Sequence, residues 1–462
     1  MAIALLALAP ATSFAADFDG SVLSPLWGLP FAGILLSIAL MPLLAPSFWH
    51  HHYGKVSAGW ALAFLLPFAV IYGVALAGAQ FVHALLAEYI PFVILLIALF
   101  AVAGGIHVRG NLHGAPGLNT AILAIGAVLA SLMGTTGASM LLIRPLIRAN
   151  DNRLHRAHVI VFFIFIVSNV GGSLTPMGDP PLFLGFLKGV DFFWTAQNIL
   201  ADTLFIVGIL LALFYAIDTW YYRKEGVLTI DPTPDTRKIG FDGAVNFWLL
   251  AGVIFFVLLS GFWKSPVSFD VHGTEVGLPG LVRDAGLIAI TLLSLKITAP
   301  QVHAANQFAW EPMAEVAKLF AGIFLTIIPV IAMLKAGVNG PFGAVVSAVT
   351  RPDGQPDPAM YFWGTGVLSS FLDNAPTYLV FFNTAGGDPQ ALMTTYATTL
   401  AAISAGAVFM GANTYIGNAP NLMVKAIAES RGVRMPSFFG YMLWSGAILV
   451  PLFVVSTFIF FR

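Results

Sequence analysis

The chain has 462 residues, of which 58% are hydrophobic and only 9% are charged, and its mean hydropathy is +0.87. A soluble domain carries about 25% charged residues, so this chain could not cover a water-facing surface and is expected to be an integral membrane protein. The formal net charge of −1 gives nucleic acid no electrostatic reason to bind. The absence of cysteine excludes disulfides, thiolate catalysis and cysteine-ligated zinc or iron–sulfur sites.

The first residues resemble a secretory signal peptide. Residues 1–16 are apolar and end in small residues, and a polar stretch from Asp17 to Gly20 follows. A basic start is missing, so the alternative is an unprocessed apolar tail or a mis-assigned start codon. In either case this segment is not expected to belong to the fold.

Apolar stretches of spanning length follow in two groups of six, separated by a polar linker at residues 223–242. In the first half, residues 28–222, they lie near 28–46, 57–80, 90–108, 119–148, 157–189 and 196–222. In the second half, residues 243–462, they lie near 244–262, 280–298, 316–337, 357–385, 394–428 and 437–461.

Two of these stretches are too long and too polar at their centres to be straight helices. Segment 119–148 contains Gly134-Thr135-Thr136-Gly137, and segment 357–385 contains Asp373-Asn374-Ala375-Pro376-Thr377. A re-entrant helical hairpin tolerates such a centre, because its tip can be buried in protein instead of lipid. Each half is therefore expected to contain one re-entrant hairpin.

The stretch after each hairpin is interrupted as well. Residues Ser168 to Pro181 read Ser-Asn-Val-Gly-Gly-Ser-Leu-Thr-Pro-Met-Gly-Asp-Pro-Pro, and Asn413 to Asn421 read Asn-Thr-Tyr-Ile-Gly-Asn-Ala-Pro-Asn. Glycine and proline at this density unwind a helix. Both stretches are therefore predicted to be broken transmembrane helices.

The two halves align at a constant offset of 239 residues at both interruptions. Ser131 falls on Ser370 in the hairpins, and Thr175, Gly178 and Pro181 fall on Thr414, Gly417 and Pro420 in the breaks. A hairpin enters and leaves on one side, so each half crosses the membrane five times, and an odd number inverts the second half. The predicted fold is an all-α polytopic membrane protein made of two inverted repeats, with the transport site at the paired breaks.

At these four motifs the chain resembles the ion transporter superfamily, which includes dicarboxylate and citrate carriers, arsenite exporters and NhaD-type sodium/proton antiporters. Residues 168–181 and 371–377 are most similar to the NhaD-type antiporter and citrate-transport branch. The resemblance covers residues 28 to 461. It implies a homodimeric scaffold made of the first three spans of each half, and a mobile transport part made of the hairpins, broken helices and last spans.

The hairpin tips depart from the patterns of this superfamily. Its carboxylate carriers share a Ser-Asn-Thr tip on each hairpin, whereas this chain has Thr135-Thr136-Gly137 and Asp373-Asn374-Ala375. Its antiporters often have acids at the first tip, where this chain has threonines. The resemblance therefore leaves the transported ion open.

Acidic residues inside the membrane are costly, which makes Asp373 and Asp179 the first candidates for ion binding. A sodium ion prefers hard oxygen ligands, so Asp373 and Asn374 form the predicted sodium site. The alternative for Asp373 is that it caps the second helix of its hairpin. Asp179 precedes two prolines, which also suits a helix cap, and a cap that faces a cavity could still titrate.

Neutral oxygen-bearing side chains near the tips and breaks complete the predicted site. The amides are Asn169, Asn413 and Asn418, and the hydroxyls are Thr135, Thr136, Ser173, Thr175, Thr377 and Thr414. The alternative for each hydroxyl is a hydrogen bond to the backbone of its own helix.

These residues favour a secondary antiporter that exchanges sodium or lithium for protons by alternating access. The alternative is a sodium- or proton-coupled symporter of citrate or another dicarboxylate. A carboxylate substrate needs positive partners, but the four motifs contain no Lys or Arg before Lys188 and Lys425. Helix N-termini and bound sodium could still hold one, so the symporter stays open.

An enzyme is not expected, because the metalloprotease and serine-hydrolase motifs are absent from the sequence. No ATP-binding motif is present, so transport is expected to use an ion gradient and no cofactor. Na⁺ and H⁺ are the expected transported ions, and the lipid bilayer of a bacterial-type inner membrane is the expected surrounding.

The positive-inside rule predicts the orientation of the chain. With the linker 223–242 in the cytoplasm, only six of the 21 Lys and Arg residues fall outside. These six are Lys188, Lys264, Arg283, Lys335, Arg351 and Arg462.

We therefore expect alkaline phosphatase fused after Arg462 to be active, because this enzyme folds only outside the cytoplasm. Green fluorescent protein at the same position should be dark, and the same two reporters inserted in the linker should give the opposite pattern. A fluorescent fusion at Arg462 would contradict the predicted orientation.

Overall fold

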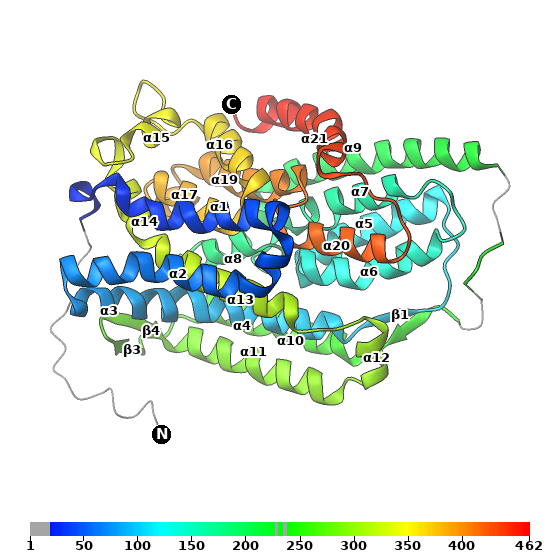
Figure 1. Cartoon of the computed structure of the whole chain (residues 1–462), viewed down its shortest axis with the longest axis horizontal. Helices are drawn as coiled ribbons and strands as arrows, with labels where there is room; N and C mark the ends of the chain where they lie inside the picture. The colour runs from blue at the N-terminus through cyan, green and yellow to red at the C-terminus, as the bar shows by residue number, and fades with distance from the viewer. Residues whose placement is uncertain (1–18, 227–229, 234–237) are drawn as a thin grey trace.

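The computed structural model describes residues 19–226, 230–233 and 238–462. The signal-peptide prediction for residues 1–16 lies outside the described residues, as does part of the linker. The described chain is mostly helical, and most of its long helices run along the long axis of the molecule (Figure 1).

The first half contains nine α-helices. They are α1 (Leu29–Leu44), α2 (Pro46–Tyr72), α3 (Val74–His83), α4 (Ile90–Gly104), α5 (Pro116–Met133), α6 (Thr135–Ala149), α7 (Ala157–Ile166), α8 (Pro180–Leu187) and α9 (Trp194–Glu225). The 3₁₀ turns η1 (Gly20–Val22), η2 (Pro25–Gly28) and η4 (Val170–Leu174) and the π-helical turn η3 (Ala84–Tyr89) complete this half.

The second half combines long helices with several short connecting helices. They are α10 (Val245–Phe262), α11 (Leu278–Ile297), α12 (Pro300–Ala305), α13 (Glu311–Thr326), α14 (Ile328–Lys335), α15 (Gly343–Ala348), α16 (Pro358–Phe371), α17 (Asn374–Thr384), α18 (Pro389–Met393), α19 (Ala397–Met410), α20 (Ala419–Ser430) and α21 (Phe438–Phe460). Two 3₁₀ turns, η5 (Gly337–Asn339) and η6 (Gly411–Asn413), lie between them.

Two small antiparallel strand pairs occur among the described residues. Strand β1 (His107–Arg109) pairs with β2 (Gly240–Asp242), which ties the loop before the first hairpin to the start of the second half. Strand β3 (Ser268–Val271) pairs with β4 (Thr274–Gly277) through His272 and Gly273. Both turn residues have positive φ, as a two-residue hairpin turn requires.

Nine described helices are long and apolar enough to span a membrane, and the bent pair α13–α14 raises the number to ten. Most predicted segments coincide with these helices, but the boundary expected between 80 and 90 was wrong. The chain instead turns at Gly73 (φ 94°) and continues as one helical stretch from Val74 to Gly104. The wide π-turn η3 ends at Tyr89, two residues before Pro91, and it accommodates the ring and the missing N–H of that proline.

Both predicted hairpins are interrupted where the sequence indicated. Helices α5 and α6 meet at Gly134, whose φ of 82° is accessible to glycine at little cost. Helices α16 and α17 meet at Leu372 and Asp373. In Figure 1, α6 lies in the right half of the molecule and α17 in the left half, so the two hairpins occupy opposite ends of the long axis.

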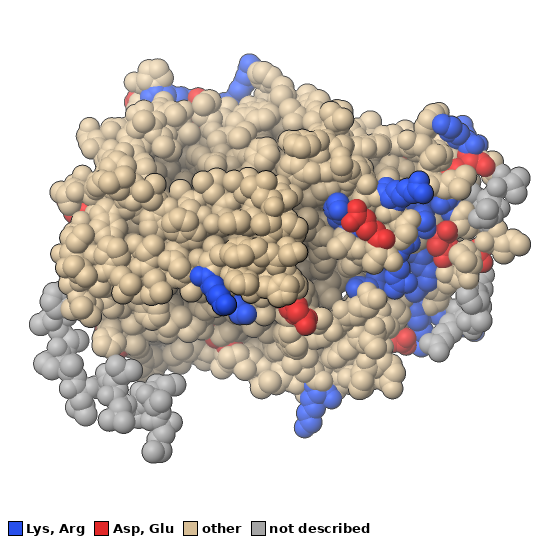
Figure 2. Space-filling view, viewed as in Figure 1, with Lys and Arg blue, Asp and Glu red and all other residues tan. Residues whose placement is uncertain are grey.

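The core of the molecule consists of the hairpins and the broken helices. In the span Ala157–Leu174, 89% of the residues are buried, against 22% in an apolar 18-residue stretch of each of α2, α10 and α21. Side chains such as Leu66, Trp248 and Leu443 remain exposed on these outer helices. Exposed apolar side chains of this kind suit a lipid-facing surface, and the space-filling view is free of charge over much of its middle (Figure 2).

Lys and Arg side chains gather at one end of the molecule, on the right in Figure 2. In Figure 1 this end holds β1 and the last turns of α9. We call it the basic end; on the predicted topology it faces the cytoplasm.

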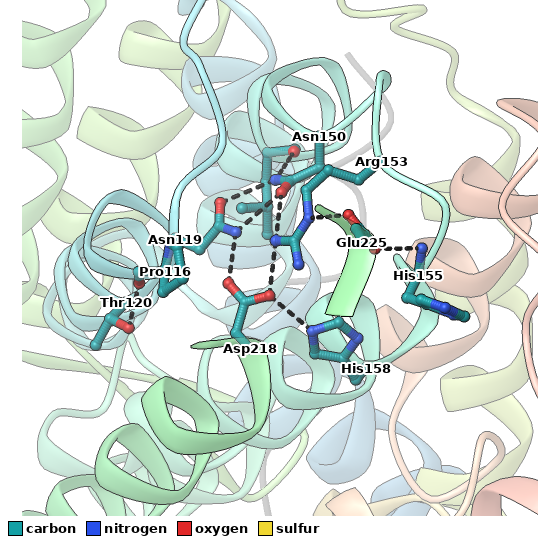
Figure 3. Close-up of polar contacts among 10 residues, drawn as sticks. Pro116, Asn119, Thr120, Asn150, Arg153, His155, His158, Asp218 and Glu225 are labelled. Atoms are coloured by element: carbon teal, nitrogen blue, oxygen red, sulfur yellow. Dashed lines mark hydrogen bonds and ion pairs between the residues drawn. The ribbon is translucent and has the colours of Figure 1, made fainter. Parts of the chain in front are cut away.

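A buried polar cluster joins the first hairpin to α9 at this end (Figure 3). Asp218 of α9 forms an ion pair with Arg153 Nη1 at 2.6 Å and a hydrogen bond with His158 Nε2 at 2.8 Å. Asn119 of α5 donates to the other Asp218 oxygen at 2.9 Å, and Glu225 pairs with Arg153 Nε at 3.3 Å. The side chains of Asp218 and Arg153 are fully buried, so each charge depends on the other for compensation.

We expect Asp218→Ala to destabilise the folded protein strongly, because it leaves the Arg153 charge buried with only Glu225 as an acidic partner. Removing one partner of a buried ion pair costs about 3–5 kcal/mol. The measurement is the thermal unfolding midpoint in detergent. The exposed Asp191, which precedes α9, provides the control Asp191→Ala, and equal midpoints for the two variants would contradict this role.

Candidate functional site

The site lies where the first broken helix resumes. The Thr175-Pro-Met-Gly-Asp-Pro-Pro segment ends at the N-terminus of α8, and Asp179 occupies the N-cap position ahead of Pro180 and Pro181. Its side chain makes no capping hydrogen bond, although the sequence suggested one. The carboxylate is therefore available to other parts of the chain.

Asp179 is 1% exposed and accepts hydrogen bonds from three other segments. Thr135 Oγ1, at the tip of the first hairpin, donates to Oδ1 at 3.0 Å. Asn374 Nδ2, at the tip of the second hairpin, donates to Oδ2. Asn418 Nδ2, at the second break, lies 3.3 Å from Oδ1. Both tips and both breaks thus meet at one carboxylate.

Backbone contacts hold these segments at short range. Thr135 N–H donates to the Gly178 carbonyl at 2.9 Å. A Cβ on Gly178 would lie 2.1 Å from the Gly172 carbonyl oxygen, and a Cβ on Gly417 would lie 2.5 Å from that of Gly411. These glycine pairs are 239 residues apart in the sequence, and both breaks fold back on themselves in a way that only glycine permits.

A chain of buried amides connects the two breaks. Asn418 Nδ2 lies 3.2 Å from Asn169 Oδ1, and Asn169 Nδ2 donates to Asn421 Oδ1 at 2.8 Å. Asn421 Nδ2 in turn donates to the carbonyls of Gly411 and Thr414, each at 2.9 Å. The amide chain therefore supplies hydrogen-bond donors to backbone carbonyls in the unwound η6 region, where no helical N–H is available to them.

Most predicted hydroxyl ligands are used inside the fold. Thr175 Oγ1 donates to the Ser131 carbonyl, and the equivalent Thr414 Oγ1 donates to the Ser370 carbonyl. These two bonds fasten each hairpin to the break of its own half. Ser173 bonds to Thr203 of α9 at 2.7 Å, and Thr377 Oγ1 donates to the Asp373 carbonyl at 3.0 Å.

Asp373 adopts the alternative considered from the sequence. Its carboxylate caps α17 by accepting from Ala375 N–H at 3.0 Å. The predicted pair Asp373 and Asn374 is therefore split, with Asn374 directed to Asp179 and Asp373 to its own helix.

Two acceptor atoms at the site have no hydrogen-bond partner among the described residues. They are Asn374 Oδ1 and Asn413 Oδ1, and both are buried. A small cavity of about 40 Å³ adjoins Asp179 and is lined in part by Thr135 and Thr136. Within the described chain, Asp179 forms no ion pair with Lys or Arg. Free oxygen acceptors and an unpaired carboxylate suit a hard cation or a proton.

Three residues here were missed by the sequence analysis. Asp202 and Asp218 lie inside the predicted span 196–222. The cost of an acidic residue inside the membrane, which singled out Asp179, applies to them as well. Asp202 is 3% exposed and adjoins Thr203, which bonds to the first break. Asn421 follows the second break and gave no signal of its own, because its importance depends on its contact with Asn169.

Comparison with known proteins places these features in a family. The profile of the family described as "Putative citrate transport" matches residues 20–461. The chain is also 26% identical over 331 residues to the "46 kDa membrane protein" of Mycobacterium leprae (strain TN). That alignment covers 69% of this chain and 71% of the relative.

The contact between the two breaks is directly testable, because the chain has no cysteine. We expect mercuric ion to bridge the two thiols of the double variant Asn169→Cys and Asn421→Cys. In the unaltered chain, Asn169 Nδ2 lies 2.8 Å from Asn421 Oδ1. Bridging is read as co-migration of the halves after cleavage at a protease site placed in the linker. Asn169→Cys paired with Ser437→Cys, which lies beyond the second break before α21, is the control. Halves that always separate would rule the contact out.

Proposed function

We propose that this chain, which belongs to the family described as "Putative citrate transport", is a secondary transporter that exchanges sodium or lithium for protons. The observation that carries the proposal is the position of Asp179. This buried carboxylate contacts both hairpin tips and the second break, and its partners are neutral donors from Thr135, Asn374 and Asn418.

The chemistry of the proposed exchange is competition at Asp179. The ionised carboxylate binds the cation, with oxygen atoms such as Asn374 Oδ1 completing its coordination. When the cation leaves, a proton takes its place and neutralises the group, which lowers the cost of the charge in the membrane. Because one carboxylate holds either ion, the two fluxes are coupled without a separate proton relay.

We interpret the two halves as inverted repeats that give alternating access to this carboxylate. The matching hydrogen bonds of Thr175 and Thr414 and the matching glycine pairs support this interpretation. Asp179 is bonded to both tips in this structure, so the described state is closed at the site. Opening from either side requires one tip, at Thr135 or at Asn374, to release Asp179.

A coupled symporter of citrate or another dicarboxylate is the second candidate. The family description favours it. The contacts of Asp179 argue against it, because they include no cationic side chain for a carboxylate substrate. In such a symporter, Asn374, Thr377, Asn413 and Thr414 would serve as substrate and sodium ligands.

We expect Asp179→Asn to abolish sodium-dependent proton movement in liposomes that contain the purified protein, because an amide cannot exchange a proton for a cation. Asp373→Asn should retain measurable exchange, since an asparagine can still cap α17. The exposed Asp191→Asn is the matched control, and thermal unfolding midpoints check that each variant is folded.

Normal exchange in Asp179→Asn would overturn the antiporter mechanism at this residue. Citrate-dependent uptake in the absence of sodium/proton exchange would favour the symporter instead. In the unaltered chain, sodium should also protect less against unfolding as the pH falls, because protons and sodium compete for the Asp179 carboxylate.

A further inference from the structure

A second cavity, of about 250 Å³, lies at the basic end of the molecule. Its lining includes Arg144 and Arg148 of α6, Arg156 just before α7, and Arg431 just after α20. Asp151 is its acidic lining residue. The cavity is thus surrounded by four guanidinium groups against one carboxylate. We call it the arginine cavity.

In the described part of the chain, no carboxylate forms a direct ion pair with the arginines of this cavity. Arg148 donates to the Val108 carbonyl at 3.0 Å, and Arg156 donates to the Gly432 carbonyl at 3.2 Å. Arg144 reaches the Gln307 side chain at 3.3 Å. These acceptors are neutral oxygens, so in the described lining Asp151 is the one acidic residue that offsets the four positive charges.

Burial makes this arrangement costly without an anion. Arg144 is only 9% exposed, and the Nε atoms of Arg144 and Arg148 are buried without a hydrogen-bond partner. Arg431 is close enough to repel both of them. The dipoles at helix C-termini offset about 0.3–1 kcal/mol per charge, which is little against several partly desolvated cations.

Asp151 supplies one negative charge against four guanidinium groups. Thr233 donates a hydrogen bond to its carboxylate at 2.5 Å. Burial, together with repulsion from Asp231, raises the pKa of Asp151. As the pH is lowered, Asp151 therefore loses its negative charge at a higher pH than an ordinary aspartate does.

We propose that the arginine cavity binds a small multivalent oxyanion, such as inorganic phosphate or a polycarboxylate. Guanidinium groups bind oxyanions with charge-assisted, often bidentate hydrogen bonds, and this ligand would supply the acceptors that the buried Nε atoms lack. The site is separate from Asp179, and it does not depend on which ion the protein transports.

The position of the cavity gives the anion a regulatory role. Helix α6 begins at Thr135 and ends at the arginine cavity, and α20 begins next to Asn418 and ends there too. Thr135 and Asn418 both contact Asp179. At 1.5 Å per residue, Arg144 lies about 14 Å along α6 from Thr135. A bound anion would hold α6 against α20, and thereby a hairpin of one half against a broken helix of the other.

The test measures anion binding to the full chain in neutral detergent by isothermal titration calorimetry, with inorganic phosphate as the main probe. Citrate is the second probe, and acetate is the monovalent comparison. We expect saturable binding of phosphate and weaker binding of acetate. Arg144→Gln and Arg431→Gln should each weaken phosphate binding by about tenfold, as expected for loss of a charged hydrogen-bonding partner.

Three variants give the proposal its controls. Arg431 is exposed, so Arg431→Gln should remain folded even where Arg144→Gln is destabilised. Arg351→Gln, outside the cavity, should bind phosphate like the unaltered chain. Asp191→Asn, at an exposed residue outside the cavity, should also bind phosphate normally.

Phosphate binding that is unchanged in both cavity variants would overturn the proposal, as would an equal loss of binding in Arg351→Gln. A titration with short-chain phosphatidylglycerol separates a soluble anion from a lipid headgroup. If only the lipid binds, and only with intact Arg144 and Arg431, the soluble ligand is excluded. None of these outcomes depends on whether sodium/proton exchange is observed.

Discussion

The convergence of neutral donors on the buried Asp179 carboxylate is the interaction on which the rest of the structure depends. A carboxylate at this depth is tolerable only if its oxygens are satisfied. Thr135, Asn374 and Asn418 satisfy them, and each comes from a different interrupted element. The hairpins must therefore end, and the second helix must break, at the place where this carboxylate lies.

The interruptions need compensation of their own, because unwound backbone inside a membrane cannot be hydrated. The structure supplies it in the same way in both halves. Thr175 and Thr414 each donate to a hairpin carbonyl, and the glycine pairs let each break fold back on itself. Asn421 adds partners for two further carbonyls. Many polar residues near the site thus hold the breaks in place, and few remain free to bind an ion.

Buried charge is handled in three different ways along the molecule. Around Asp218 and Arg153 opposite charges neutralise each other, which suits a structural clamp between the first hairpin and α9. At Asp179 a single charge is surrounded by neutral donors, which suits exchange of a small cation for a proton. In the arginine cavity four positive charges lie around one carboxylate, that of Asp151, which suits an anion from solution. The charges of the first arrangement are neutralised within the chain, whereas the other two arrangements favour the binding of a ligand.

The sequence by itself determined the membrane class, most of the spans and the helix interruptions within 119–148, 157–189, 357–385 and 394–428, because hydropathy, glycine and proline act locally. It also provided the offset of 239 residues, at which the structure shows matching contacts at Thr175 and Thr414. Only the tertiary structure distinguished the contacts of the two aspartates. Asp373 and Asp179 both precede helices and look alike as caps, yet Asp373 caps its helix and Asp179 does not. The difference arises because the second hairpin places Asn374 against Asp179, 195 residues away. The arginine cavity likewise joins α6 to the end of α20, and no local pattern records a contact between segments so far apart.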